Sequence, residues 1–456
     1  MLKALYDEFY ARRPAQSVPV GHVGEIRRSL SNRPLTVGIV GAGPAGLSAA
    51  RLLEETGRAR AIVFEKEERV GGKSFSTPRY GSIHDIGTCY STIAHAATNR
   101  WMRELRIPQR PIDRQMIDGV PVIRYILGDR PLTTASEALR FFKVWKTQMR
   151  AFEERPDDPD VREAAATPVG AWLDARRLSS MRRYMQRGLT NMGYGYLDET
   201  PTVQALRWCG PALLISGALK RIKAPENGWQ AFWERLSQSL DVRLGQPVNE
   251  IRRGNECIDI ITPAGATRVD ALLIAAPLDE IANAMHLTSA EQRVVDSVKW
   301  DRIVASLVSI EGWRRTNHIV AYEESLRPGA PPGTLLSSRA AGSPPPKKDR
   351  HGTRFFMCFQ YGGTLPTDVL AEKLRHDIQQ RGGYLDHIAM QKVWKFAPRY
   401  DADALRLGLI SQMRAMQGDQ RTWYSGSTFS FEAVSNIVEF NRVLAPDMVR
   451  RIETMR

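Results

Sequence analysis

The chain has 456 residues, of which 43% are hydrophobic, 25% are charged and 8% are aromatic. This composition excludes a wholly disordered or fibrous chain, and the length predicts two or three domains with ample core. Lysine and arginine (64 residues) outnumber aspartate and glutamate (50), and the resulting net charge of +14 is also typical of proteins that bind nucleic acids.

The four cysteines, Cys89, Cys209, Cys257 and Cys358, lie far apart, without a CxxC pair or a His-rich partner segment. They predict neither a metal site nor a disulfide framework, and they fit a reducing compartment. The longest apolar stretch in a candidate strand, 271–277, is far shorter than the about 20 residues that span a bilayer. Because the N-terminus also has no signal-peptide core, we expect a cytoplasmic protein without a membrane span.

Residues 1–33 are interpreted as an extension before the first domain. Leu2, Leu5, Tyr6 and Phe9 fall at helical spacing, which predicts a short amphipathic helix. We expect this helix to pack on the body of the protein or on a second subunit rather than to serve a membrane role.

A βαβ unit is predicted next. Residues 35–40 read Leu-Thr-Val-Gly-Ile-Val, a pattern typical of a buried strand, and they run into the glycine-rich turn 41–46. A helix is expected at 47–55 and a second strand at 61–64. This order places the unit at the head of a parallel sheet.

The turn carries the spacing Gly41-x-Gly43-x-x-Gly46. The first glycine permits a tight turn, the second lets the backbone approach a pyrophosphate, and the third lets the helix pack closely on the strand. The helix N-terminus offers N–H groups to the phosphates, and Glu65, at the end of the second strand, can accept hydrogen bonds from a ribose diol. The unit therefore predicts dinucleotide binding.

A second glycine turn follows directly, at Arg69-Val70-Gly71-Gly72-Lys73-Ser74. The glycine pair lets the chain pass close under a diphosphate, and Lys73 adds a positive charge. The alternative is a solvated basic turn.

In the rest of the chain, helical sequence patterns alternate with patterns typical of short strands and loops. Residues 130–220 are helical and basic in pattern, and short strands are predicted on both sides of position 300, at 242–244, 248–251, 258–261, 271–276, 303–312 and 354–361. The Pro-, Gly- and Ser-rich segment 328–351 is interpreted as a mobile loop, with a lid as the alternative. A last strand, glycine turn and helix are predicted at 422–444. The positive end of this helix would stabilise negative charge on a bound group, and a flavin would carry such charge on its pyrimidine edge when it is reduced.

Taken together, these motifs resemble the flavin-containing amine oxidase superfamily. The resemblance extends to Gly228-Trp229-Gln230, to 248–251 and to 275–277, and it covers most of residues 35–445. It implies an α/β fold with a discontinuous Rossmann-type FAD-binding domain and a substrate domain that has a mixed β-sheet and a helical insertion. The implied FAD-binding domain comprises 34–115, 225–295 and 400–450, and the implied substrate domain comprises 116–224 and 296–399.

The same resemblance implies the residues that hold FAD. Val248 would hold the adenine through its backbone, and no cysteine lies where some relatives bond the flavin, so we expect non-covalent FAD. Only one dinucleotide fingerprint is present, so an NADPH domain is not expected. The implied cofactor residues are Gly41, Gly43, Ala45, Gly46, Glu65, Lys66, Gly72, Lys73, Gly87, Thr88, Val248, Gly426, Ser427 and Val434.

Within the superfamily, several shorter stretches look most like the bacterial polyenoic fatty acid isomerases. They are 192–198, 394–398, 416–418 and Ser430-Phe431. Two amine oxidase features have no counterpart: strand 301–307 offers no lysine at an obvious register, and the paired tyrosines of the amine cage are missing. Simple oxidation of an amine by oxygen is therefore not the expected reaction.

The resemblance also suggests catalytic residues. Tyr194 and Tyr196 would line the pocket near the flavin, with ordinary core aromatics as the alternative. Arg114 would pair with a substrate carboxylate as a planar fork, with a solvated surface charge as the alternative. His84 would lie beside the flavin ring, where a structural hydrogen bond is favoured over acid–base chemistry. Trp394 belongs either to the pocket wall or to the core.

Three functions follow from these observations. The first is an FAD-dependent oxidase or desaturase that takes a hydride from a substrate carbon to flavin N5. The second is a redox-neutral double-bond isomerase of an unsaturated fatty acid. The third, of another class, is a nucleic-acid or anionic-surface binder with a structural FAD, which the dispersed arginine pairs disfavour. The charge is better explained by anionic ligands, so we expect a small-molecule substrate, a carboxylate or a carrier-bound acyl group, and no nucleic acid.

Overall fold

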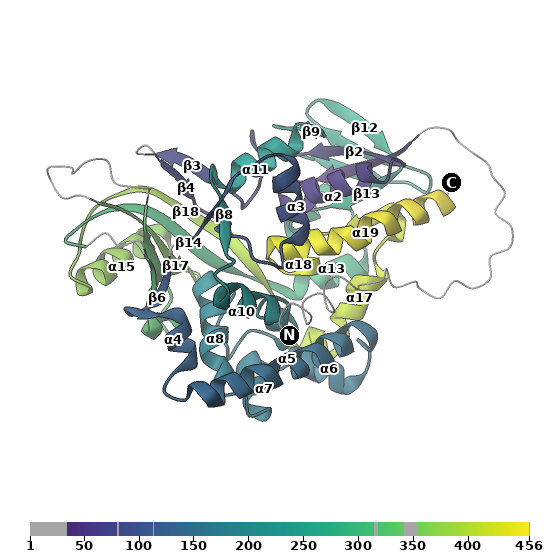
Figure 1. The fold of residues 1–456 in the computed structure, drawn as a ribbon. Helices are drawn as coiled ribbons and strands as arrows, with labels where there is room; N and C mark the ends of the chain where they lie inside the picture. Colours follow the sequence, from purple (N-terminus) through teal and green to yellow (C-terminus); the bar gives the residue numbers. More distant parts are fainter. Residues whose placement is uncertain (1–33, 80–81, 113, 314–317, 342–353, 456) are drawn as a thin grey trace.

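The computed structural model describes residues 34–79, 82–112, 114–313, 318–341 and 354–455, which form two main sheets and a layer of helices (Figure 1). The predicted N-terminal extension, 1–33, and the part of the predicted loop at 342–353 lie outside the described residues.

A five-stranded parallel sheet has the predicted βαβ unit at its centre, in the order β19-β13-β1-β2-β9. Strand β1 has a neighbour on each side and layers on both faces, so its side chains are buried in both directions. That position explains its almost continuous apolar run. The strands are β1 (Leu35–Val40), β2 (Ala59–Phe64), β9 (Asp241–Arg243), β13 (Ala271–Ile274) and β19 (Thr422–Tyr424).

Helices cover one face of this sheet, and a small antiparallel sheet covers the other (Figure 1). Alternate β1 side chains point to the two layers: Val37 and Ile39 pack on the helices, and Val40 packs toward the small sheet. Gly38 leaves room for the small sheet, because a Cβ there would lie 2.3 Å from the Ile260 side chain. The helices are α2 (Pro44–Glu55), α3 (Ala96–Glu104), α11 (Gly228–Ser237) and α19 (Val434–Thr454), and the small sheet contains β10 (Glu250–Arg253), β11 (Ile258–Thr262) and β12 (Gly265–Val269).

The second main sheet is mixed and has seven strands, in the order β18-β14-β17-β16-β15-β6-β7. All its pairs are antiparallel except β15 with β6. Helix α15 (Thr367–Gln380) packs Leu374 and Ile378 on it. The strands are β6 (Arg114–Ile117), β7 (Val120–Pro121), β14 (Val298–Glu311), β15 (His318–Ala321), β16 (Leu335–Ala340), β17 (Arg354–Tyr361) and β18 (Tyr384–Tyr400).

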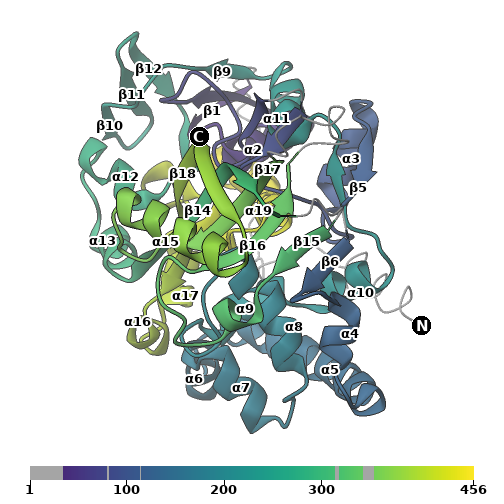
Figure 2. The same cartoon turned by 90° about the vertical axis from the view of Figure 1, so that its left-hand side faces the viewer.

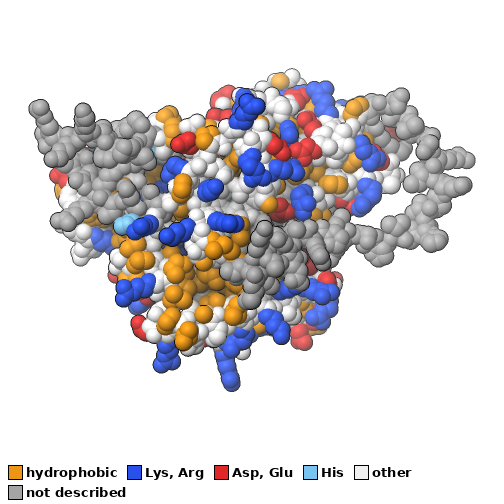
Figure 3. Space-filling model, viewed as in Figure 1, with side chains coloured by type: hydrophobic (Ala, Val, Ile, Leu, Met, Phe, Trp, Pro, Cys, Tyr) orange, Lys and Arg blue, Asp and Glu red, His pale blue; other side chains and the backbone are white. Residues whose placement is uncertain are grey.

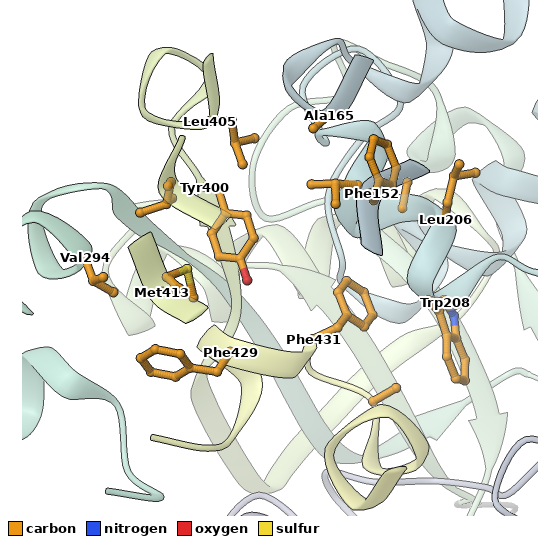
Figure 4. Close-up of a cluster of buried hydrophobic side chains, with 14 of the residues drawn as sticks. Phe152, Ala165, Leu206, Trp208, Val294, Tyr400, Leu405, Met413, Phe429 and Phe431 are labelled. Carbon is orange, nitrogen blue, oxygen red and sulfur yellow. The ribbon is translucent and has the colours of Figure 1, made fainter. Parts of the chain in front are cut away.

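A layer of helices lies below the two sheets in Figure 1 and meets them through aromatic side chains. Figure 4 shows Phe152 and Leu206 from this layer near Tyr400, Phe429 and Phe431 of the C-terminal segments, all of them buried. The helices are α4 (Val122–Leu127), α5 (Pro131–Glu154), α6 (Pro159–Ala166), α7 (Val169–Ala175), α8 (Met181–Gly188), α9 (Thr202–Trp208) and α10 (Pro211–Ala218).

Short elements connect these layers. Strands β3 and β4 form a hairpin, and β5 pairs with β8. They are β3 (Ser76–Arg79), β4 (Ser82–Asp85), β5 (Gln109–Pro111), β8 (Lys223–Pro225), α12 (Leu278–Ile281), α13 (Ser289–Asp296), α14 (Glu323–Leu326), α16 (Ala402–Arg406), α17 (Leu409–Ala415) and α18 (Ser427–Ser430).

The α/β fold, with a parallel sheet, a mixed sheet and a helical segment after residue 130, is confirmed. The interpretation of 328–351 as one loop is wrong at 335–340, where β16 pairs with β15 and β17 and buries Leu335 and Leu336. The proline and glycine content hid this strand, because its partners lie outside the segment.

Candidate active site

The first glycine turn follows β1 at the carboxyl edge of the parallel sheet, and its three glycines have different surroundings. Gly41 has a φ of +102°, which favours glycine. A Cβ on Gly46 would lie 1.9 Å from the carbonyl oxygen of Gly41, so only glycine lets α2 pack this closely on the turn. Gly43 has an ordinary extended conformation and borders a cavity, and a Cβ there would meet only the Gly72 Cα, at 3.9 Å.

This cavity has a volume of about 360 Å³ and lies at the carboxyl ends of the parallel strands, and we call it the strand-end cavity. Two of the residues predicted to hold the cofactor do not line this cavity: Gly46 is absent from its lining, and Gly87 lines a neighbouring cavity. The other residues predicted to hold the cofactor all line it: Gly41, Gly43, Ala45, Glu65, Lys66, Gly72, Lys73, Thr88, Val248, Gly426, Ser427 and Val434.

The strand-end cavity fits the predicted FAD. Gly43 and Gly72 face each other so closely that a Cβ on Gly72 would lie 3.1 Å from the Gly43 Cα, which leaves bare backbone on this wall. The N–H group of Ala45, in the first turn of α2, has no carbonyl partner within the helix and lies at its positive end. A backbone wall beside a helix N-terminus suits a pyrophosphate.

Glu65 lies at the end of β2 and is held by backbone amides. Its two carboxylate oxygens accept hydrogen bonds from Ala42 N–H at 2.7 Å and from Glu67 N–H at 3.0 Å. Each oxygen has a further lone pair, and the residue lines the strand-end cavity. The carboxylate can therefore accept ribose hydroxyl groups in a fixed orientation.

A second cavity, of about 110 Å³, lies between the parallel sheet, the mixed sheet and the helices, and we call it the central cavity. It adjoins the strand-end cavity, since Lys73, Thr88, Trp394, Glu432 and Val434 line both. A flavin ring at the inner end of the strand-end cavity would therefore face the central cavity.

Lys73 and Glu432 form an ion pair where the two cavities meet. Lys73 Nζ donates to a Glu432 carboxylate oxygen at 2.9 Å and to the Phe396 carbonyl oxygen at 2.6 Å. Burial raises the pKa of Glu432, and the Lys73 ammonium opposes that shift. The charge of Lys73 is thus already balanced by Glu432 before any diphosphate is considered.

Aromatic side chains form one wall of the central cavity. The Tyr194 ring stacks on Phe396 with centroids 5.5 Å apart, and it also contacts Phe431 at 5.0 Å and Trp208 at 5.8 Å. Burial raises the pKa of Tyr194 well above its ordinary value. Its phenol is therefore neutral at physiological pH and can donate a hydrogen bond but cannot act as a base.

Two arginines and one amide that the sequence did not reveal also line the central cavity. Arg187 is 7% exposed and donates to the Gln115 side-chain oxygen, while its Nε is without a partner among the described residues. The side-chain oxygen and nitrogen of Asn191 are both buried without a partner in the same part of the chain. Arg339 donates to the Asp85 carbonyl oxygen at 2.7 Å.

The spacing of Arg187 gave a signal that could have been noticed. It lies three residues after Tyr184 on the buried face of α8, and a charge within an apolar stripe is rarely structural without a partner. Burial lowers the pKa of Arg187, but a guanidinium stays protonated in proteins. Neither Arg187 nor Arg339 forms an ion pair with a described acidic side chain, so the cavity offers positive charge to a ligand.

The structure does not bring the other predicted catalytic residues to either cavity. Tyr196 belongs to the core, where its hydroxyl donates to the Ser325 carbonyl at 3.2 Å and its ring contacts Tyr361. Arg114 is exposed on β6, because the strand turns that side chain to the surface. His84 hydrogen-bonds the Arg79 carbonyl at 3.0 Å, and burial lowers its pKa.

Trp394 lines both cavities and donates its indole N–H to the Ile86 carbonyl at 2.9 Å.

The described residues contain no group of three His, Cys, Asp or Glu side chains placed to hold a metal ion. Within the same ranges, no helix combines the length and the apolar composition that crossing a membrane requires.

Comparison with known proteins gives a family and a fold. The model of the flavin containing amine oxidoreductase family matches residues 44–318. AofH of Mycobacterium tuberculosis, a flavin-containing monoamine oxidase by name, is 27% identical over 278 residues, which are 55% of this chain and 59% of that protein. A polyenoic fatty acid isomerase of Ptilota filicina is 22% identical over 234 residues, which are 45% of this chain and 47% of that protein. The chain thus spans about half the length of the curated relatives it matches.

Among solved structures, a CLA-producing fatty acid isomerase from P. acnes is similar with a TM-score of 0.76 and 18% identity. The match covers 91% of this chain and 98% of that one. At this identity the likeness shows the fold alone.

Proposed function

The chain belongs to the flavin containing amine oxidoreductase family, and on that premise we propose that it is an FAD-dependent enzyme that acts on a carbon atom of an apolar, anionic substrate. FAD, which the strand-end cavity would hold through its glycine walls and Glu65, supplies a hydride acceptor when it is bound. We further propose that the binding is non-covalent, since the resemblance places no cysteine where some relatives bond the flavin, and that the enzyme works in the cytoplasm, since the four cysteines form no disulfide.

The buried charge in the central cavity carries this proposal. Arg187 and Asn191 present polar groups without partners to a cavity whose walls are otherwise largely aromatic and aliphatic. A carboxylate would pair with the guanidinium and accept from the amide, and the apolar walls would contact its hydrocarbon part. A cationic amine would instead meet two guanidinium groups of like charge, which disfavours the substrates of ordinary amine oxidases.

The chain's own residues would orient the substrate and exclude water. Tyr194 and Phe396 would hold a planar or unsaturated segment by stacking, and the Tyr194 hydroxyl would donate a hydrogen bond without taking a proton. The pair of Lys73 and Glu432 would fix a positive group and a negative group beside the reacting carbon.

Two outcomes remain within this proposal, and we favour oxidation with desaturation. The second candidate is a redox-neutral double-bond isomerase, which the likeness to the two fatty acid isomerases and the anion-binding character of the central cavity support. Both reactions use the same two cavities, and they differ in the atom to which the hydride is finally transferred.

Anaerobic spectroscopy tests the proposal. The purified holoenzyme is mixed with an unsaturated fatty acid, with its methyl ester and with an aliphatic diamine, and the flavin absorbance is recorded. Bleaching by the acid that persists until air is admitted indicates an oxidase or desaturase, whereas conversion of the acid without net bleaching or oxygen uptake indicates an isomerase. A protein that cannot take up FAD would contradict the whole proposal.

A variant tests the anion site separately. R187M keeps the volume of the side chain and removes the charge, and we expect affinity for the acid to fall at least about 30-fold while affinity for the methyl ester stays within about twofold. R442M removes an exposed arginine of α19 and serves as the matched control. Equal affinity of wild type and R187M for the acid would exclude Arg187 as the anchor.

A further inference from the structure

A surface formed by α4, α5 and α10 combines exposed apolar side chains with cations. Leu132 is 86% exposed, Leu139 is 52% exposed, Leu219 is 49% exposed and Ile123 is 39% exposed. Figures 1 and 2 show α10, α4 and α5 beside one another on the same side of the molecule. Figure 3, from the direction of Figure 1, shows hydrophobic side chains gathered over this helical region with lysines and arginines around them. We call it the basic–apolar face.

A cation adjoins each exposed apolar residue along the chain. Arg124 follows Ile123, Arg130 lies two residues before Leu132 and directly after the exposed Asp129, Arg140 and Lys143 follow Leu139, and Lys220 and Arg221 follow Leu219. None of these six cations forms an ion pair with an acidic side chain in the described part of the chain, whereas many other surface arginines do. The positive charge of this face is therefore not neutralised by the protein itself.

Acidic side chains are scarce on helix α5, which forms the lower edge of the face. Between Pro131 and Phe152 the only acidic residue is Glu137, and it is buried and accepts a hydrogen bond from the Ser180 backbone N–H. The outward side of the helix between Leu132 and Lys143 thus offers leucine, arginine and lysine, while the exposed acids Glu153 and Glu154 lie at the far end of the helix, where they pair with Arg414 and Arg150.

We propose that the basic–apolar face docks on the surface of a membrane that contains anionic lipids. Leucine and isoleucine side chains would enter the boundary between headgroups and acyl chains, and the surrounding cations would contact the lipid phosphates. An anionic membrane surface thus complements both the exposed apolar side chains and the unpaired cations of the face. The inference stands independently of the proposed function.

Other partners match only half of the face. A second copy of the chain would bring the same unpaired cations against each other, at an energetic cost that the exposed leucines do not offset. Nucleic acid would complement the cations, but its phosphate backbone offers nothing to four exposed aliphatic side chains.

Co-sedimentation of the holoenzyme with vesicles tests the proposal. We expect binding to vesicles of phosphatidylcholine and phosphatidylglycerol in equal parts, little binding to phosphatidylcholine alone, and weakening of the binding as salt shortens the Debye length from about 10 Å to about 3 Å. R130Q/K143Q should lower partitioning roughly 25-fold, at about fivefold for each cation removed. L132D/L139D should lower it by at least about tenfold.

The control is L407D, which makes one such leucine-to-aspartate change at a residue that is 84% exposed beside α16, on the other side of the molecule in Figure 2. It should bind vesicles like the wild type, and flavin absorbance and melting temperature verify that each variant is folded. Absence of the wild type from the anionic vesicle pellet would overturn the proposal, as would equal losses in L407D and L132D/L139D. A concentration-dependent dimer that L132D/L139D abolishes would also overturn it, because a second copy would then cover the face.

Discussion

Alanine substitutions at Gly43 and Gly46, which lie in the same glycine turn, should have different effects: G43A should weaken FAD binding, and G46A should lower the stability of the fold. Gly43 has φ −77° and ψ −176°, which any residue can adopt, and a Cβ there would meet no heavy atom closer than the Gly72 Cα at 3.9 Å. A Cβ on Gly46 would lie 1.9 Å from the carbonyl oxygen of Gly41, a backbone atom that cannot rotate away. The same methyl group therefore meets a cavity in one variant and the backbone in the other.

The expected magnitudes differ accordingly. G43A should change apoprotein stability by less than about 1 kcal/mol, because the lower entropy of the unfolded chain and the weaker helix cap of alanine nearly cancel. Its methyl group would stand in the strand-end cavity, so FAD should bind at least about tenfold more weakly. G46A gains about 0.5–1 kcal/mol of helix propensity but loses about 1–3 kcal/mol or more through overpacking against backbone. The G46A apoprotein should therefore melt several degrees lower.

Flavin titration and thermal melting of the apoproteins measure the two effects separately. G217A is the control, because a Cβ at Gly217 of α10 would meet nothing within 4 Å. It should leave FAD binding unchanged and stabilise the apoprotein by the same helix propensity of about 0.5–1 kcal/mol that G46A gains. A G43A protein that binds FAD as tightly as the wild type would refute the reasoning about the cavity. A G46A apoprotein with wild-type stability would refute the reasoning about helix packing.

Three further predictions address single side chains. E65A should weaken FAD at least about tenfold, because it removes the ribose acceptor and leaves the Ala42 amide without its partner; unchanged flavin content would exclude Glu65 from that role. Burial lowers the pKa of His95 from 6.5 to about 3, so the native state holds it neutral while the unfolded chain binds a proton below pH 6.5. Wild-type stability should be complete above that pH and fall by up to about 1.4 kcal/mol per unit toward pH 3, and H95N should melt with a flatter pH dependence; parallel curves would contradict this. Y194F should keep substrate affinity through stacking on Phe396 but lose turnover, whereas Y194A should lose both, and full turnover in Y194F would exclude the hydroxyl from catalysis.

Much of the strand-end cavity could be predicted from the sequence because its determinants are local. Gly41, Gly43 and Gly46 act within one turn, and Glu65 follows from the end of the next strand. A spacing of this kind constrains backbone conformation and close approach within a few residues, and such constraints are visible in the sequence itself. The parallel pairing of β1 with β2 follows from the same unit.

The central cavity could not be predicted in this way, because its wall comes from segments that are far apart. Arg187 and Asn191 follow one another near α8, whereas Arg339 lies on β16 and Trp394 on β18. The sequence instead favoured Arg114, which β6 turns to the surface. Arginines look alike in a sequence, and only the packing around each one decides whether its charge is solvated or buried.

The sequence by itself determined the parallel sheet and its glycine turn, and it led us to expect anionic ligands. The tertiary structure decided which cations face a ligand, since the net charge of +14 is the sum of buried, paired and unpaired groups. The structure distinguishes three kinds of cation: the buried Arg187 of the central cavity, the unpaired cations of the basic–apolar face, and the arginines held in surface ion pairs. Composition fixes how much charge a chain carries, whereas burial and the distance to the nearest opposite charge fix what that charge can bind.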